Sequence, residues 1–417
     1  MVIMLVAVFM LFVVGAMAAL AIDLVTLYTA RSEAQLAADG AALAGARVLA
    51  NSGMTSDTTG GLIPAAEAFA TTIATQVATR QNEVGGRTLN PPEVTVSFND
   101  SDASFPTNPH VTVQTRRVDL PTFFARIWGN SALTVAATAT AEAYNPSGAR
   151  ILGGTNPVQL TCVKPWLLPN KDPSNSDNPI FDTTTGAINP ASSLLGWSFT
   201  SPSGKPLSRN PICTDAGGCI LPQVAPPSWN YFPGDDATNF PHPTNSLPSC
   251  APALTSNYQE SVAGCIQTAI SCNQLANIDT NPYGGNRNLD TANAVNCLTH
   301  ATNNLGDTVA VPVPPVAPFQ FIAGTDNPVP GAAPNNVMVS DSLVTVPVFD
   351  SSGGAVPTVQ IIGFVQLFLN PDGIATPAGG SVNTTVVNMA GCGTGAAGTA
   401  ILGNGASPVA VRLISSP

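Results

Sequence analysis

The longest apolar run of the chain lies at its N-terminus. Residues 1–22 carry no charged side chain, and no proline occurs before Pro64. At about 1.5 Å per residue, such a helical run covers roughly 33 Å, which is close to the thickness of the hydrocarbon core of a bilayer. The pattern therefore predicts a membrane-anchoring helix that continues without a break to about residue 50.

Small residues recur at four-residue intervals along this predicted helix. On one face of a helix, small side chains let the backbone of a partner helix approach closely. Alanine also has the highest helix propensity, so the same face is equally compatible with packing on its own domain. Both interpretations stay open. The candidate packing residues are Gly15, Ala19, Ala34, Ala38, Gly40, Ala42 and Gly45.

Alternating apolar and polar residues predict three strands after this helix. They are Val94–Phe98, His110–Val118 and Leu133–Tyr144, and a short amphipathic helix is predicted between the last two, over Leu120–Gly129. One face of the third strand is small enough for the alanine-rich helix to approach it closely. The residues on that face are Leu133, Val135, Ala137, Ala139, Ala141 and Ala143.

Beyond residue 145 the chain is dominated by Pro, Asn, Gly, Ser and Thr, which is typical of a loop-rich body. Two short helices are predicted there, over Tyr258–Ser271 and Thr291–Ala301. Past Gly306, β-branched runs predict a sandwich or barrel-like antiparallel domain. These runs are Thr308–Val313, Asn336–Phe349, Val356–Leu369, Val382–Met389 and Val409–Ile414.

The predicted fold class is therefore α+β. We expect three parts: an anchor and its helix over 1–50, a small α+β membrane-proximal domain over 51–145, and a mainly-β distal domain over 146–417. The length of 417 residues is sufficient for this organisation. A net charge of −11, a pI near 4.5 and scattered basic residues exclude nucleic acid as a partner, because phosphate contacts need clustered Lys and Arg.

All eight cysteines follow the anchor, and their even number and irregular spacing favour disulfides over a zinc site. Disulfides place the body in an oxidising compartment, either the periplasm or the cell exterior. The candidates are Cys162, Cys213, Cys219, Cys250, Cys265, Cys272, Cys297 and Cys392.

The sequence constrains the disulfide pairing in several ways. The Asp-Ala-Gly-Gly turn between Cys213 and Cys219 favours a disulfide between them. If Cys265 and Cys272 share one helix, they lie about 10 Å apart along it and cannot pair with each other. Cys250 and Cys297 are then their nearest candidate partners, and Cys392 is expected to tie the final hairpin to an earlier segment.

The orientation of the anchor follows from the cysteines. They require the N-terminus in the cytoplasm and the body outside, although Arg31 weakly favours the opposite orientation. A start codon further upstream, with a short basic segment, would remove this conflict. The alternative is a cleaved signal peptide, with Ala16–Ala18 as the processing site.

The N-terminal residues resemble the signature of the Flp pilus-assembly TadE/TadG-like proteins. The matching segments are Ala21-Ile22-Asp23, Leu27-Tyr28, Ala30-Arg31, Gln35 and Ala37-Ala38-Asp39-x-Ala41-Ala42-Leu43-Ala44, with Asp23, Tyr28, Arg31 and Asp39 as signature residues. Val25, Ala34 and Gly40 depart from the family pattern. A strand–Pro-Thr-Phe-Phe-Ala–strand segment extends the resemblance to residue 145.

The resemblance implies a single transmembrane helix in the bacterial inner membrane that runs on into an extracytoplasmic helix. It also implies a structural or assembly role in a Flp (Tad) type pilus or related surface appendage. The implied partners are the inner membrane, other pilus-assembly proteins or pilins, and a second copy of the chain.

We find no sequence motif for catalysis, for a cofactor or for a metal. Asp100–Ser104 and Asp350–Gly354 miss the metal-dependent adhesion motif, and Asp279–Asp290 is a poor calcium loop. The expected protein is therefore not an enzyme. The first alternative function is a membrane-tethered adhesin or glycan-binding module. An exposed cluster of Trp166, Trp197, Trp229 and Tyr231 would serve it, although burial under loops is the favoured interpretation of these aromatics. The second is an exported enzyme with an unfamiliar site.

Overall fold

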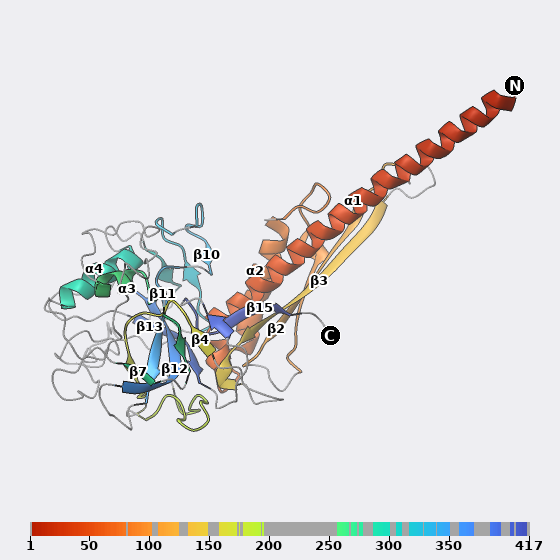
Figure 1. Cartoon of the computed structure of the whole chain (residues 1–417). Helices are drawn as coiled ribbons and strands as arrows, with labels where there is room; N and C mark the ends of the chain where they lie inside the picture. Colours follow the sequence, from red (N-terminus) through yellow and green to blue (C-terminus); the bar gives the residue numbers. More distant parts are fainter. Residues whose placement is uncertain are drawn as a thin grey trace.

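The computed structural model of the chain has a rod-like helix at one end and a mixed α/β body at the other (Figure 1). The residues that it describes are 2–80, 82–101, 107–124, 132–148, 158–172, 175, 178–192, 194–195, 257–266, 268–272, 275–277, 287–300, 306–310, 317–327, 329–338, 340–350, 358–370, 384–392, 401–403 and 406–414.

Helix α1 is one uninterrupted α-helix of 50 residues, Val2–Asn51, which confirms the long helix predicted from the sequence. Its N-terminal part projects away from the rest of the molecule (Figure 1). The helix ends at Asn51, and Gly53, which has a φ of 86°, leads into the 3-10 helix η1, Met54–Ser56. A Cβ at Gly53 would lie 3.0 Å from the carbonyl oxygen of Val387, so both the backbone conformation and the space require glycine.

Helix α2, Ile63–Arg80, packs beside α1 (Figure 1). It buries one apolar face in the same core as α1, and the polar face is left outward. The buried residues of α2 are Ala66, Phe69, Ala70, Ile73, Ala74 and Ala78. The short 3-10 helix η2, Pro91–Glu93, leads from this helical pair into the first strand.

The proximal sheet has the order β1-β2-β3-β15 and is antiparallel throughout. Its strands are β1 (Val94–Phe98), β2 (His110–Pro121), β3 (Ala132–Tyr144) and β15 (Ala410–Ile414). The first three confirm the predicted strands. The predicted short helix is wrong at Leu120 and Pro121, which extend β2; residues 125–129 of it lie outside the described residues.

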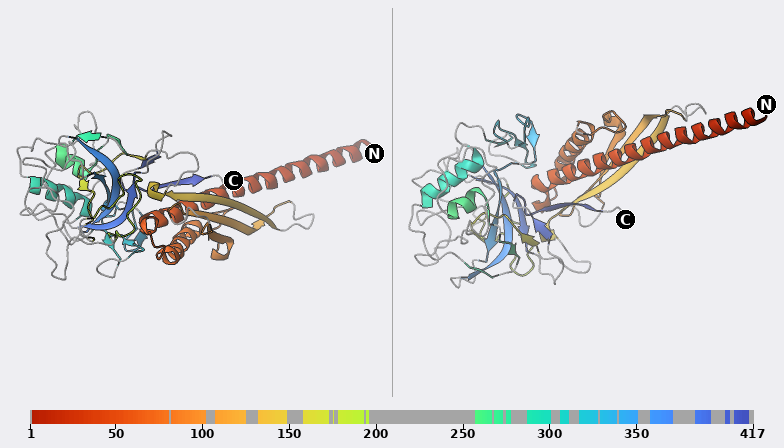
Figure 2. Two further views of the ribbon diagram at one scale, coloured as in Figure 1. Left: turned by 90° about the horizontal axis from the view of Figure 1, so that it is seen from below. Right: turned by 45° about the horizontal axis from the view of Figure 1, so that its top comes forward.

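The C-terminal strand is where the domain expectation fails. We expected Val409–Ile414 in the distal domain, but β15 pairs with β3, from Ala410 opposite Tyr144 to Ile414 opposite Thr140. The proximal part of the molecule is therefore built from both ends of the chain. β15 lies beside α1 and not in the distal sheet (Figure 2).

The alanine face of β3 packs on α1, as the alternation predicted. Ala141 and Ala143 are fully buried, and so are Ala34 and Ala38 of the helix. All four belong to one core cluster. Because none of these side chains extends beyond a methyl group, the helix and the sheet approach closely over the length of the strand.

The distal part is organised around a second sheet, β13-β12-β11-β5, with β7 paired to β12. Its strands are β5 (Leu168–Pro169), β7 (Leu275–Asn277), β11 (Leu343–Phe349), β12 (Thr358–Leu369) and β13 (Thr384–Gly391). β11, β12 and β13 are antiparallel, and every residue of β11 and β13 is buried. This burial shows that the sheet is covered on both faces at β11 and β13.

Two helices form the outer layer over this sheet, α3 (Asn257–Ala263) and α4 (Arg287–Thr299). They share a core with it, in which Val262 and Leu298 meet Val346 and Val365. Both confirm predicted helices, although α3 stops before Gly264 and is shorter than expected. The distal part is thus a sheet packed against helices within the α+β class.

Small sheets and a turn complete the body. One sheet contains β14 (Ile401–Gly403), β4 (Val158–Leu160) and β6 (Ile270–Ser271), and another contains β10 (Asn336–Val337), β9 (Phe321–Ile322) and β8 (Thr308–Val309). The 3-10 helix η4, Pro146–Gly148, joins β3 to the distal part.

Two disulfides are described, Cys162–Cys265 and Cys272–Cys392, with Cα–Cα distances of 4.6 and 5.2 Å. Cys392 thus ties the end of β13 to an earlier segment, as expected. The expected partners of Cys265 and Cys272, which were Cys250 and Cys297, are wrong. Cys265 and Cys272 both follow α3, and their partners Cys162 and Cys392 follow strands. Cys297 is disulfide-bonded as well. The predicted Cys213–Cys219 pair and Cys250 lie outside the described residues.

Candidate functional site

The N-terminal half of α1 is the most distinctive surface of the molecule. Among the described helices, α1 is the one whose length and composition suit a membrane crossing. Its large apolar side chains up to residue 17 are between 39% and 86% exposed, so the folded body does not cover them. These residues are Ile3, Met4, Leu5, Val6, Val8, Phe9, Met10, Leu11, Phe12, Val13, Val14 and Met17. A contiguous apolar surface of this kind marks contact with a membrane or with protein.

Asp23 lies where the uncharged run ends. Its carboxylate is 7% exposed and accepts hydrogen bonds from the backbone N–H groups of Phe123 (2.9 Å) and Phe124 (3.0 Å). The structure thus gives this signature residue a definite contact, which joins α1 to the chain that follows β2. The sequence did not indicate this contact, since the residues are 100 positions apart.

The other signature residues lie further along α1. Tyr28 is 64% exposed, and Arg31 is exposed as well. Asp39 is half-buried and accepts a hydrogen bond from Gln35 at 2.7 Å, while the same amide also lies 3.3 Å from the carbonyl oxygen of Thr138 in β3. Asp39 therefore helps to hold the helix on the sheet through Gln35.

Most of the candidate packing residues lie inside the molecule. Ala34, Ala38 and Ala42 are fully buried, and Ala19 is buried too. At Gly45 an added Cβ would lie 3.0 Å from Val111 and 3.5 Å from Ala74, and at Gly40 it would lie 3.8 Å from Val77. The described structure therefore matches the interpretation that this face packs on its own domain. Gly15 has no atom within 4 Å of an added Cβ and remains open to a partner.

Large apolar side chains that the small-residue pattern did not indicate also stay exposed on α1 from Leu20 onward. They are Leu20, Leu24, Val25, Tyr28 and Leu36, each between 48% and 66% exposed. At about 100° per residue, Val25, Tyr28 and Leu36 fall within about 80° of one another and form one exposed face, whereas Leu20 and Leu24 lie five turns before Ala38 and Ala42, on the small-residue side. The signal in the sequence is the recurrence of large residues at Leu20, Leu24 and Tyr28.

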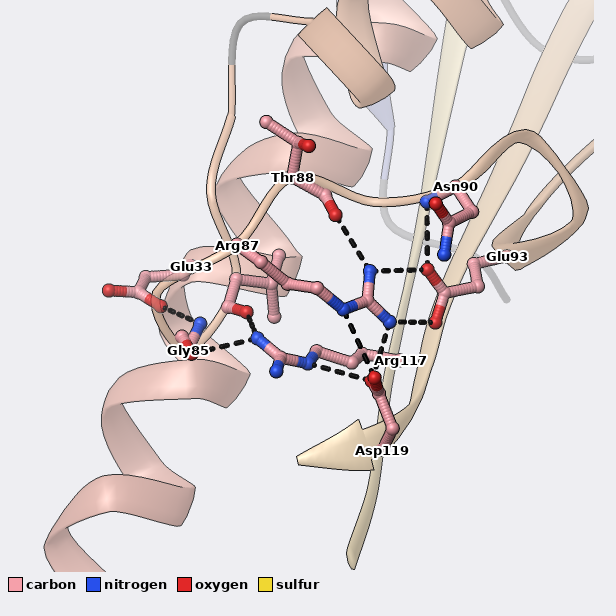
Figure 3. Close-up of polar contacts among 9 residues, drawn as sticks. Glu33, Gly85, Arg87, Thr88, Asn90, Glu93, Arg117 and Asp119 are labelled. Atoms are coloured by element: carbon pink, nitrogen blue, oxygen red, sulfur yellow. Dashed lines mark hydrogen bonds and ion pairs between the residues drawn. The ribbon is translucent and has the colours of Figure 1, made fainter. Parts of the chain in front are cut away.

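An ion-pair network lies on the side of the proximal domain, between the loop before β1 and β2 (Figure 3). Arg87 binds Glu93 through two hydrogen bonds of 2.8 Å and also contacts the carboxylate of Asp119. These bonds raise the pKa of Arg87 and hold the pKa of Glu93 and of Asp119 below their ordinary values. All three side chains therefore stay charged over the physiological range.

The same network reaches α1 through Arg117, which is 5% exposed. Its guanidinium donates to the carbonyl oxygen of Gly85 (2.8 Å) and to Asp119 (3.1 Å), while the N–H of Gly85 donates to Glu33 of α1 (2.6 Å). Gly85 has a φ of 59°, and a Cβ there would collide with Leu120. The network thus joins the helix, the loop and β2 into one unit (Figure 3).

A second, buried polar cluster joins α1 to the distal sheet. Asn145 donates to the carbonyl oxygens of Thr55 (3.0 Å) and Met389 (2.8 Å), and the N–H of Met389 donates to Ser56 at 2.8 Å. Asn388 accepts a hydrogen bond from Thr55 at 3.2 Å. Buried amides with several partners fix one geometry, so the rod and the body are held rigidly together.

The described residues bring no chemically reactive constellation together. Within them, no group of three or more His, Cys, Asp or Glu side chains could hold a metal ion. Burial lowers the pKa of Lys164 to about 7, and its ammonium donates to the carbonyl oxygen of Gly264. Trp166 is 2% exposed and belongs to the core, whereas Trp197, Trp229 and Tyr231 lie outside the described residues.

Comparison with known proteins gives one family match. The family model described as "Putative Flp pilus-assembly TadE/G-like" matches residues 2–48, which is nearly the whole of α1. Neither a curated protein nor a solved structure matched the chain. The match confirms the resemblance drawn from the signature residues, and it ends before α2 and both sheets. Residues 2–48 of this chain are therefore similar to the TadE/G-like segment that this family model describes.

Proposed function

We propose that the protein is a membrane-anchored structural or assembly component of a Flp (Tad) type pilus or a related surface appendage. The observation that carries this proposal is that one helix has two roles. Its first part exposes apolar side chains that suit a bilayer, and its second part forms the centre of the proximal core. The same helix is the segment that matches the pilus-assembly family.

The proposed location is the bacterial inner membrane, with the N-terminus in the cytoplasm and the body in the periplasm or outside the cell. The disulfides Cys162–Cys265 and Cys272–Cys392 support this orientation, because such bonds persist in oxidising compartments. The distance between the membrane and the distal body is then set by the rod formed by α1 and the proximal sheet.

The proposed partners are pilins, other pilus-assembly proteins or a second copy of this chain. They would bind the exposed face of α1 that carries Val25, Tyr28 and Leu36, since the small-residue face is already occupied by β2, β3 and α2. The proposal includes no catalytic activity and no cofactor. The body is a rigid domain that the helix holds at the membrane.

The test is recovery of the full-length, tagged protein from membranes of cells that assemble such pili. We expect the protein to remain with the membranes after an alkaline wash and to co-purify with pilins or pilus-assembly proteins. The variant Leu36→Glu should lower that recovery while leaving the membrane association intact. The matched control is Leu275→Glu in β7, where the wild-type side chain is equally exposed, at 68% against 66%.

Three results would contradict the proposal. They are a wild-type protein that an alkaline wash releases, one that co-purifies with no pilus component, and equal partner recovery for Leu36→Glu and wild type.

A further inference from the structure

The hairpin formed by β2 and β3 is much longer than the rest of the proximal sheet. β2 and β3 have 12 and 13 residues, whereas β1 and β15 have 5 each. β1 pairs with β2 no further than Thr115, and β15 pairs with β3 no further than Thr140. The remaining ends of β2 and β3 pair with each other and extend along α1 toward its N-terminus (Figures 1 and 2).

Asp23 fixes how far along α1 the hairpin reaches. Because its carboxylate accepts the N–H groups of both Phe123 and Phe124, the chain at the end of β2 is held at the level of residue 23. Asp23 is 7% exposed, so this contact is enclosed and strong for a hydrogen bond to a charged group. Leu120 pairs with Leu133 just before it and is 1% exposed, which anchors the hairpin end on the core.

That level coincides with the edge of a bilayer around α1. The uncharged helical residues before Asp23 cover about 30 Å, which is the hydrocarbon thickness, and the headgroup layer adds roughly 5–8 Å on each side. The chain directly after β2, held by Asp23, therefore lies at the boundary between hydrocarbon and headgroups. Phe123 is 63% exposed there and Val118 of β2 is 48% exposed. Tyr28 of α1 is 64% exposed about one and a half turns further out.

We propose that the chain directly after β2, at Phe123, is a second membrane contact, in which Phe123 enters the interfacial layer of the lipid and Asp23 sets its depth. Interfacial protein segments bury Trp, Phe and Leu side chains at the boundary between headgroups and acyl chains, so an exposed phenylalanine at this level gains apolar contact there. Two contacts, a helix and a hairpin, fix the tilt of the body relative to the membrane, which one helix alone does not. The inference rests on the proposed membrane anchoring.

The experiment places the photoreactive residue p-benzoylphenylalanine at one position at a time in the full-length protein, reconstituted in phosphatidylcholine nanodiscs. The positions are Phe123, Val13 in the uncharged run, and Leu275 in the distal sheet, all of which are exposed. After illumination, mass spectrometry counts lipid adducts on each peptide. We expect adducts at Phe123 at least about fivefold above those at Leu275, because a side chain at the boundary between headgroups and acyl chains contacts lipid and one in the distal sheet does not.

The second arm is Asp23→Ala combined with the probe at Phe123. It should lower adducts at that position at least about twofold and leave those at Val13 unchanged, because the charge-assisted hydrogen bonds that hold the hairpin end are lost. Adducts at Val13 but not at Phe123 overturn the hairpin contact alone. Adducts at neither position overturn the membrane anchoring as well. Crosslinks from Phe123 to another protein chain in native membranes, in place of lipid, also overturn the membrane contact of Phe123.

Discussion

The side-chain amide of Asn145 donates a hydrogen bond of 2.8 Å to the backbone carbonyl oxygen of Met389, which is 244 residues away in the sequence. Asn145 follows β3 of the proximal sheet, and Met389 belongs to β13 of the distal sheet. The same amide also donates to Thr55, just after α1. One fully buried side chain therefore holds the rod, the proximal sheet and the distal sheet in a single arrangement.

Replacing this amide should loosen the junction. Asn145→Ala removes the donor to the carbonyl oxygens of Thr55 and Met389, of which Met389 keeps the hydroxyl of Ser56 at 2.8 Å. The loss of a buried donor should lower the free energy of unfolding by about 1–3 kcal/mol. The measurement is chemical unfolding of the full-length protein in detergent, together with amide exchange in β13. The matched control is Asn175→Ala, whose amide donates to Ala191 at the surface. Equal stability of the two variants would argue against a structural role for the junction.

Enlarging the small-residue face should disrupt the fold of the molecule itself. Ala38 is fully buried against the chain's own core, so Ala38→Leu overpacks it and should cost about 1–3 kcal/mol or more. The effect should appear as a lower midpoint of thermal unfolding in purified protein, with no partner present. Leu36→Ala, two residues away and 66% exposed in the wild type, should change that midpoint little. If Ala38→Leu unfolds like wild type and loses only partners, this face is an interface between chains after all.

The two described disulfides should appear as defined peptide pairs. Proteolysis without reduction should release Cys162 linked to Cys265 and Cys272 linked to Cys392. Each bond spans more than 100 residues of sequence, and a loop of that length corresponds to about 4–5 kcal/mol in the chain-entropy account. Cys272→Ser with Cys392→Ser should therefore lower stability strongly. A peptide that links Cys265 or Cys272 to Cys250 would contradict this pairing.

The burial of Lys164 should make the free energy of unfolding depend on pH. Burial lowers its pKa from 10.5 to about 7, so between these values the unfolded chain binds a proton at Lys164 that the folded chain does not. The free energy of unfolding should therefore rise as pH increases from 7 toward 10, with a slope of at most about 1.4 kcal/mol per pH unit. Urea unfolding at several pH values measures the slope. Lys164→Met should abolish this rise, and Lys171→Met in the adjoining segment should retain it.

Local sequence patterns were sufficient to predict the elements whose apolar and polar residues recur with a helix or strand period. The uncharged run and the alanine spacing predicted α1, and the alternation over residues 133–144 predicted both β3 and the face that it buries. The predicted helix over Leu120–Gly129 failed at its start, because pairing of Leu120 with Leu133 extends β2 there. In that instance a tertiary hydrogen-bonding partner outweighed a local helix signal.

The sequence alone determined that this protein has one membrane-length helix, a small-residue face on it, a TadE/G-like signature and a β-rich, disulfide-containing body. Tertiary structure decided which faces are used: Ala34 and Ala38 are inside, Leu36 is outside, and Asp23 holds the end of β2. It also decided that β15 returns to β3 and that Cys272 meets Cys392. The physical reason is separation along the chain. Contacts between residues 100 or more positions apart leave no periodic pattern, and only the packing of the whole core selects them.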